Sequence, residues 1–313
     1  MVVFHETEDR PTLRVSVVVF SRVPFYLAGV ENFTMQIGLF GINTGACANP
    51  ATAAAVAQRA EAAGFESLWT GEHVVLPDPR EAPSPAAPET PMLHPPALLA
   101  YLAGQTSRIK LATGITLVAQ RNPVVLAKEI GSLDVLCGGR LLFGIGAGYL
   151  HQEFAALGID FASRGARTDE YIDAMRELWN AEKPAFDGRY VKFSGINAQP
   201  RPVQVGGPPV IVGGTSPGAL RRAVQRGQGW YGFALDVATT AKVLDALKTL
   251  LATMPRSATL GELSLSITPP VLPTKTMLED YAALGVTRII PMLRNNSAQT
   301  ALGTVDKLAN DLF

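Results

Sequence analysis

An acid–histidine pair follows a short apolar run early in the chain. Residues 65–70 read FESLWT, and Gly71, Glu72 and His73 come directly after them. Parallel α/β enzymes place catalytic groups at the C-terminal ends of their strands. Histidine changes its charge near neutral pH, so His73 is suited to proton transfer, with Glu72 tuning it. We therefore predict catalytic roles for Glu72 and His73; the alternative is a structural pair at a surface turn.

Two glycine-rich turns follow later apolar runs and could hold a ligand. The first, Gly144-Ile145-Gly146-Ala147-Gly148, departs from the dinucleotide fingerprint G-x-G-x-x-G because Tyr149 stands at the last position. In the second, residues 210–212 run into Gly213-Gly214-Thr215, and Ser216-Pro217 then opens a helical pattern. A helix N-terminus with free N–H groups attracts anions, so this turn suits a phosphate, although an ordinary capped turn explains it equally well.

Composition narrows the classes of function. The 313 residues are 47% hydrophobic, and 27 basic residues balance 27 acidic ones. This balance gives no reason to expect a nucleic-acid partner or an anionic membrane, and we find no apolar run long enough to span a bilayer. The two cysteines and four histidines have no metal-ligand spacing, so we predict no metal. A cytoplasmic location is the default.

Strand-like and helix-like segments alternate from Met35 onward. Eight such pairs in 279 residues fit a (β/α)₈ TIM barrel. We predict that residues 35–313 form this barrel and that residues 1–34 are an N-terminal extension, either disordered or foreign to the native chain. The predicted strands are 36–40, 65–70, 109–117, 140–145, 209–212, 230–233, 263–267 and 287–292. The predicted helices are 50–63, 96–106, 123–136, 167–180, 217–226, 237–251, 276–284 and 298–312.

Two long connections interrupt this alternation. Residues 74–94 contain six prolines and follow the predicted strand that carries His73, so they form either a lid over the site or an extended surface loop. Residues 183–207 form an insertion between the fourth helix and the fifth strand. Within it, FDGRYVKF (186–193) predicts a small hairpin around Asp187-Gly188.

Several segments together resemble the luciferase-like monooxygenase superfamily, and most closely its coenzyme F420-dependent oxidoreductase branch. The resemblance covers residues 35–232 well and the remainder weakly. It rests on the order and spacing of AEAAGFESLWTGEHVVLP (60–77), LATGITLVAQ through GIGAGYLHQEFAALGIDF (111–161), FDGRYVKF, and PPVIVGGTSPGALRRAVQRGQGWYG (208–232).

The resemblance implies a ring-shaped redox cofactor at the barrel mouth. It places Glu72 and His73 beside the ring and a non-proline cis peptide at Gly114-Ile115 behind it. Residues in two turns would hold the cofactor's side chain and phosphate: Gly146, Ala147, Gly148, Gly213, Gly214 and Thr215. Tyr149 stands where a related sugar-phosphate dehydrogenase has a catalytic glutamate, which argues against the same substrate.

The resulting hypothesis is an F420-dependent oxidoreductase that transfers a hydride between the deazaflavin and a small organic substrate. It would act as a homodimer, as the resemblance implies. One alternative is an FMN-dependent luciferase-like monooxygenase, and another is a non-catalytic barrel that binds a cofactor. Arginines could contact the acidic F420 tail, with Arg164, Arg167, Arg201 and Arg221 as candidates. The sequence does not indicate the substrate.

Overall fold

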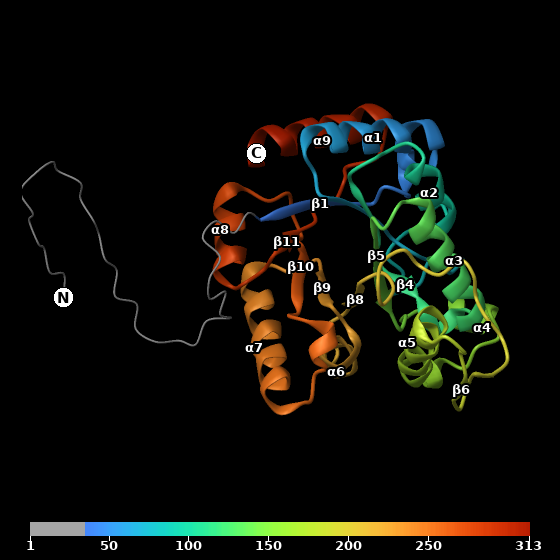
Figure 1. Ribbon diagram of the computed structural model, residues 1–313. Helices are drawn as coiled ribbons and strands as arrows, with labels where there is room; N and C mark the ends of the chain where they lie inside the picture. The colour runs from blue at the N-terminus through green and yellow to red at the C-terminus, as the bar shows by residue number, and fades with distance from the viewer. Residues whose placement is uncertain (1–34) are drawn as a thin grey trace, which may run out of the picture. The chain divides into compact units, whose positions relative to one another are not determined.

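The computed structural model describes residues 35–313, which form a closed barrel of parallel strands with helices outside it (Figure 1). The strands follow the order β1, β2, β3, β5, β8, β9, β10, β11, and β11 pairs with β1 to close the ring. The predicted (β/α)₈ TIM barrel is therefore confirmed. The prediction for residues 1–34 lies outside the described part of the chain.

The barrel strands are short, apolar and buried, because helices cover their outer faces and side chains fill the interior. A central cluster of Trp69, Ala112, Leu142, Ile211, Tyr231 and Ile290 fills the barrel. The strand bounds are β1 Gln36–Phe40, β2 Ser67–Thr70, β3 Lys110–Thr113, β4 Thr116–Leu117, β5 Leu141–Gly146, β8 Val210–Gly213, β9 Gly229–Phe233, β10 Ser264–Thr268 and β11 Arg288–Ile289.

Most of the outer helices begin at a polar cap, which fixes where each βα loop ends. Asn49 and Asn122 each accept two backbone N–H bonds and precede a proline at the first helical position. Four other helices begin at a side chain that accepts one backbone N–H bond: Ser216, Asp236, Thr274 and Ser297. The helix bounds are α1 Pro50–Ala63, α2 Pro95–Ala103, α3 Pro123–Leu136, α4 His151–Ala156, α5 Arg164–Asn180, α6 Pro217–Arg226, α7 Val237–Thr253, α8 Lys275–Ala283 and α9 Ala298–Leu312.

The third barrel strand is broken, where the sequence predicts one strand over 109–117. Its lower part, β3, pairs with the start of β5, and its upper part, β4, pairs with the end of β5. Between them the Gly114–Ile115 peptide bond is cis, as the family resemblance implied. A side chain at Gly144 would overlap the Thr113 carbonyl, and one at Gly146 would overlap the Ile115 side chain. The positions of β5 that face the break between β3 and β4 therefore require glycine.

The predicted insertion and its hairpin are present between α5 and β8. β6 (Phe186–Asp187) pairs antiparallel with β7 (Lys192–Phe193). Glu170 on α5 fastens this hairpin, because its carboxylate accepts the backbone N–H groups of Arg189, Tyr190 and Val191. The sequence pattern missed the short helix α4 between β5 and α5.

A partly buried ion-pair cluster closes the N-terminal end of the barrel. Arg288 donates to both oxygens of Glu66, at 2.9 and 3.0 Å, and Lys110 reaches the same carboxylate at 2.8 Å. Burial would raise the pKa of Glu66, but Arg288 and Lys110 outweigh it and lower that pKa to about 2. This cluster stabilises the end of the barrel opposite the predicted site. Within residues 35–313, no helix has both the length and the apolar character needed to cross a membrane.

Candidate functional site

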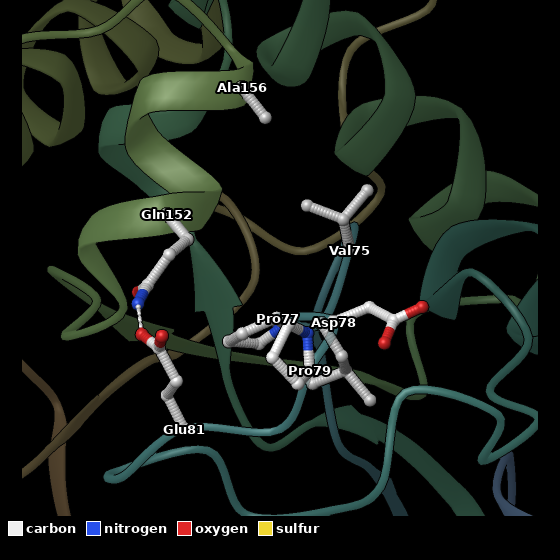
Figure 2. Close-up of a pocket in the computed structure, with 8 residues that line it drawn as sticks. Val75, Pro77, Asp78, Pro79, Glu81, Gln152 and Ala156 are labelled. Atoms are coloured by element: carbon white, nitrogen blue, oxygen red, sulfur yellow. Dashed lines mark hydrogen bonds between the residues drawn. The ribbon is translucent and has the colours of Figure 1, made fainter.

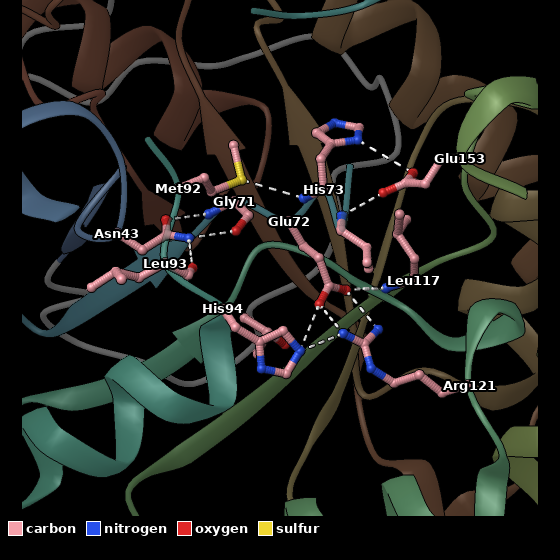
Figure 3. A network of polar contacts seen from close by, with 12 residues as sticks. Asn43, Gly71, Glu72, His73, Met92, Leu93, His94, Leu117, Arg121 and Glu153 are labelled. Carbon is pink, nitrogen blue, oxygen red and sulfur yellow. Dashed lines mark hydrogen bonds and ion pairs between the residues drawn. The ribbon is translucent and has the colours of Figure 1, made fainter. Parts of the chain in front are cut away.

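His73 sits at the mouth end of β2 between an acid and a phenol. Its Nδ1 lies 3.4 Å from Glu153 Oε2, and its Nε2 lies 3.3 Å from the Tyr149 hydroxyl. Glu153 comes from the start of α4, and its other oxygen accepts the backbone N–H of Val74 (Figure 3). The His73 side chain is only 9% exposed, so these neighbours set its environment.

Glu153 is the buried anion of this group. Burial would raise its pKa, but hydrogen bonding from His73, the nearby Gln120 amide and the Val74 N–H together lower it. The buried Gln120 amide has no hydrogen-bond partner by geometry, so we attribute the lowering chiefly to His73 and Val74. Glu153 is therefore ionised at neutral pH.

Glu72 belongs to a different cluster from His73. Its carboxylate is almost fully buried and accepts the Leu117 N–H at 2.6 Å and two bonds from the Arg121 guanidinium (Figure 3). Arg121 Nη2 also lies 2.8 Å from His94 Nε2. Because a guanidinium has no acceptor, Arg121 is the donor in this bond. The predicted pair of Glu72 and His73 is thus adjacent in sequence but separated in its contacts, and Glu153 holds the position beside His73 that we expected for Glu72.

Asn43 holds the turn that carries both residues. Its amide donates to the carbonyls of Gly71 and Leu93 at 2.8 Å, and its oxygen accepts the Gly71 N–H at 2.9 Å. The backbone N–H of His73 reaches Met92 Sδ. The end of the proline-rich loop is therefore anchored against the β1 and β2 turns, and these bonds fix the direction in which His73 points.

The two predicted glycine turns meet around Ile115. Side chains at Gly146 and at Gly213 would both come within close contact of the Ile115 side chain, so the ends of β4, β5 and β8 converge there. Gly148 adopts a left-handed φ of 83° and Gly214 one of 107°. Ala147 is half-buried between the glycines. The structure thus brings three of the predicted cofactor-binding residues, Gly146, Gly213 and Ile115, together on one side of the mouth.

Aromatic rings flank this glycine-lined edge. Phe40 lies next to Gly114 and Gly71, and its ring centroid is 5.0 Å from that of Phe233. Phe233 is 46% exposed at the end of β9. Phe40 and Ile115 both pack against the central barrel cluster. Together Phe40, Ile115 and Phe233 form an apolar floor at the mouth that suits a flat ring.

The turn after β8 leaves polar groups exposed. Gly214 and Thr215 are exposed, and Ser216 caps α6 by accepting the Ala219 N–H. The Gly214 N–H is already bonded to the Tyr231 carbonyl. An anion at this turn would therefore meet the Thr215 hydroxyl and the first N–H groups of α6.

The candidate tail-binding arginines separate into two groups. Arg201 donates to the carbonyls of Asn180 and Ala181 at the C-terminal end of α5. That end lies at the bottom of the barrel, because the helix runs antiparallel to the strands, so the prediction for Arg201 was wrong. Arg164 and Arg167 begin α5 at the mouth end, and Arg221 is exposed on α6.

A cavity of about 330 Å³ lies between the proline-rich loop and α4 (Figure 2). It is lined by Val75, Leu76, Pro77, Asp78, Pro79, Glu81, Gln152 and Ala156. Gln152 donates to Glu81 at 2.7 Å and so connects α4 to the loop across this space. Glu153 follows Gln152 in the chain, but neither it nor His73 lines this cavity.

Three residues of the site escaped the sequence analysis: Glu153, Arg121 and Asn43. Glu153 lies 80 positions from His73 along the chain, and no local motif joins the two. Position offered one signal, because Glu153 follows the glycine turn of β5 and the C-terminal ends of all barrel strands meet at the mouth. Arg121 and Asn43 follow β4 and β1 and could have been found by the same argument.

Comparison with known proteins identifies the family and agrees with the fold. The sequence model described as luciferase-like monooxygenase matches residues 25–302. An uncharacterised protein of Mycobacterium tuberculosis is 31% identical over 269 residues, which cover 83% of this chain and 94% of the relative. The crystal structure of the monooxygenase RslO1 from Streptomyces bottropensis matches with a TM-score of 0.70 at 19% identity, over 89% of this chain and 98% of that one.

Two relatives with named activities match over shorter stretches. An F420-dependent hydroxymycolic acid dehydrogenase of M. tuberculosis is 31% identical over 61% of this chain and 51% of its own length. The oxygenase component of a flavin-dependent trigonelline monooxygenase of Acinetobacter baylyi is 31% identical over 54% of this chain and 44% of its own. Since the family model spans most of the chain, this protein belongs to the luciferase-like monooxygenase family of oxidoreductases.

Proposed function

We propose that this protein is a coenzyme F420-dependent oxidoreductase acting on a small organic substrate at the barrel mouth. The observation that carries the proposal is the convergence of Gly146 and Gly213 on Ile115, beside the apolar floor. A flat tricyclic ring needs such a wall without projecting side chains. The floor lies at the same end of the barrel as His73, and acid–base chemistry next to a redox ring is what hydride transfer requires.

Separate groups at the barrel mouth would bind the ring, bind the phosphate and transfer the proton. Phe40, Ile115 and Phe233 would support the ring and exclude water, and Thr215 with the start of α6 would hold the phosphate. The deazaflavin, when bound, would supply the hydride chemistry. His73 would exchange a proton with the substrate side of the site. Glu72 would act indirectly, because its carboxylate fixes Leu117 and Arg121 at the end of β4.

The choice of F420 over FMN rests on the family branch that the GEHVVLP and GGRLLFGIGAGYL segments resemble, and the hydroxymycolic acid dehydrogenase is consistent with it. The trigonelline monooxygenase keeps FMN as the second candidate. Arg164, Arg167 and Arg221 are the mouth-side cations suited to an oligoglutamate tail. A cytoplasmic location and a homodimer remain predictions, and size-exclusion chromatography with light scattering tests the dimer.

Equilibrium titration of the protein with F420 and with FMN, at several salt concentrations, tests the cofactor. We expect tighter binding of F420 and a loss of that advantage as salt screens the tail contacts. FMN binding at least as tight as F420 binding would support the flavin monooxygenase instead. Binding without turnover across a panel of alcohols, ketones and enones would favour the non-catalytic barrel.

A further inference from the structure

The neighbours of His73 determine which atoms donate and which accept in its hydrogen bonds. Glu153 is ionised and can only accept, so the proton facing it sits on His73 Nδ1. Neutral His73 then presents an unprotonated Nε2 to the Tyr149 hydroxyl, 3.3 Å away. Tyr149 must therefore donate, and the chain of bonds runs from Tyr149 through His73 to Glu153.

The three residues of this hydrogen-bonded series differ in their exposure to solvent. Tyr149 is 45% exposed, whereas the side chain of His73 is 9% exposed and that of Glu153 is fully buried. The Tyr149 ring also meets the His73 ring edge to face, with centroids 5.6 Å apart. A ligand at the mouth would meet the tyrosine hydroxyl before it meets the imidazole.

We propose that Tyr149 is the group that exchanges a proton with the substrate, with His73 as its proton acceptor and Glu153 as the positioning residue that holds the imidazole. This inference rests on the proposed function for the redox half of the reaction. It moves the direct acid–base role from His73 to Tyr149. The two bonds that link the three residues are 3.3 and 3.4 Å long.

The proton balance follows the same chain. A bound deazaflavin would supply the hydride acceptor for the oxidation of a substrate alcohol, and the hydroxyl proton of that alcohol would pass to the Tyr149 oxygen. The proton of Tyr149 would move to His73 Nε2 at the same time, and the imidazolium would then be paired with the Glu153 carboxylate. Reduction of a carbonyl is the reverse, with the imidazolium returning its proton to Tyr149 as Tyr149 protonates the oxygen.

The protonation states fit these roles. Burial and the negative charge of Glu153 both raise the pKa of Tyr149, so the phenol keeps its proton at neutral pH. Among the other charged groups of the mouth, the Glu72–Arg121 ion pair and His94 lie on the Leu117 side and bond one another. Arg164 donates to the carbonyls of Gly148 and Phe161, and Arg167 donates to the hydroxyls of Ser163 and Tyr171. Their contacts leave the Tyr149–His73–Glu153 chain intact.

The test is nitrogen NMR of the full-length protein labelled with ¹⁵N-histidine, without cofactor. We expect neutral His73 to carry its proton on Nδ1, and we expect Tyr149→Phe to move the Nε2 resonance toward that of an imidazole nitrogen with no hydrogen bond. Tyr101→Phe is the matched control, because Tyr101 is exposed on α2 and has no hydrogen bond to the site. A His73→Asn variant assigns the signal.

Tyrosine titration supplies a second readout. In Glu153→Gln the pKa of Tyr149 should fall toward its ordinary value, because the neighbouring negative charge is gone. Difference absorbance of the phenolate between this variant and one that also carries Tyr149→Phe measures it. A wild-type His73 with its proton on Nε2, or an Nε2 signal unmoved in Tyr149→Phe, would overturn the relay. Neither readout needs F420, so a failure of the cofactor assignment is detected separately.

Discussion

Neighbouring residues at the mouth differ in role because they differ in partner. Glu72 and His73 leave the β2 end in different directions, and each meets a residue from a distant segment. A carboxylate held by a guanidinium and a backbone N–H is a structural anchor, whereas an imidazole between a carboxylate and an exposed phenol can move a proton. We therefore assign Glu72 a structural role and His73 a role in proton transfer.

Replacing Arg121 by Met should destabilise the fold. The change leaves the Glu72 carboxylate buried without its cation, which costs about 3 kcal/mol for such a pair. In the double variant Glu72→Gln/Arg121→Met no charge is buried, so most of that loss should return. Urea unfolding measures both, with the exposed Arg294→Met as control. Equal stability of the single and double variants would show that the pair is not coupled.

The Glu66 cluster predicts a specific acid sensitivity. The folded pKa of Glu66 is lowered to about 2, so its contribution to stability is present above its unfolded pKa, near 4.5, and is lost as the pH falls from there through about 2. Glu66→Gln should flatten the stability-versus-pH curve in this window, while the exposed Glu262→Gln should not. Unfolding free energies measured at pH 5, 4 and 3 make the comparison.

At the scale of elements, the break between β3 and β4 shapes the mouth. A methyl group at Gly146 would meet the end of the Ile115 side chain, so Gly146→Ala should destabilise the protein and weaken cofactor binding. Ile115→Val removes the atom that is hit, and we expect Gly146→Ala/Ile115→Val to be more stable than Gly146→Ala alone. Thermal unfolding of the four proteins measures this, and an unrelieved double variant would contradict the packing argument.

Elements were easier to predict than contacts between them. Short local patterns predict individual strands and helices. Examples are the apolar run VIVG of β8 and the proline that follows an asparagine cap at α1 and α3. The barrel could therefore be predicted from the order of these patterns along the sequence. The partners of His73 and Glu72 are set by barrel closure, which brings together residues 80 and 49 positions apart. The helix α4 was missed because it has only 6 residues, too few to show a period.

For the whole molecule, closure of the barrel makes a prediction about its first segment. β1 begins at Gln36 and pairs with β2 on one side and β11 on the other, so residues 35–313 close the ring among themselves. A protein that begins at Met35 should therefore match the full chain in melting temperature and in F420 affinity. Because the family match begins at residue 25, a protein beginning there is the natural comparison.

Comparing the two shortened proteins shows which residues before β1 the fold requires. If both equal the full chain, residues 1–34 are dispensable for folding and binding. If the chain beginning at residue 25 is stable and the chain beginning at Met35 is not, the ten residues between them support the barrel, and the predicted boundary at residue 35 is wrong. Calorimetry and cofactor titration should be run together, because a loss confined to affinity would assign those residues to the mouth of the barrel.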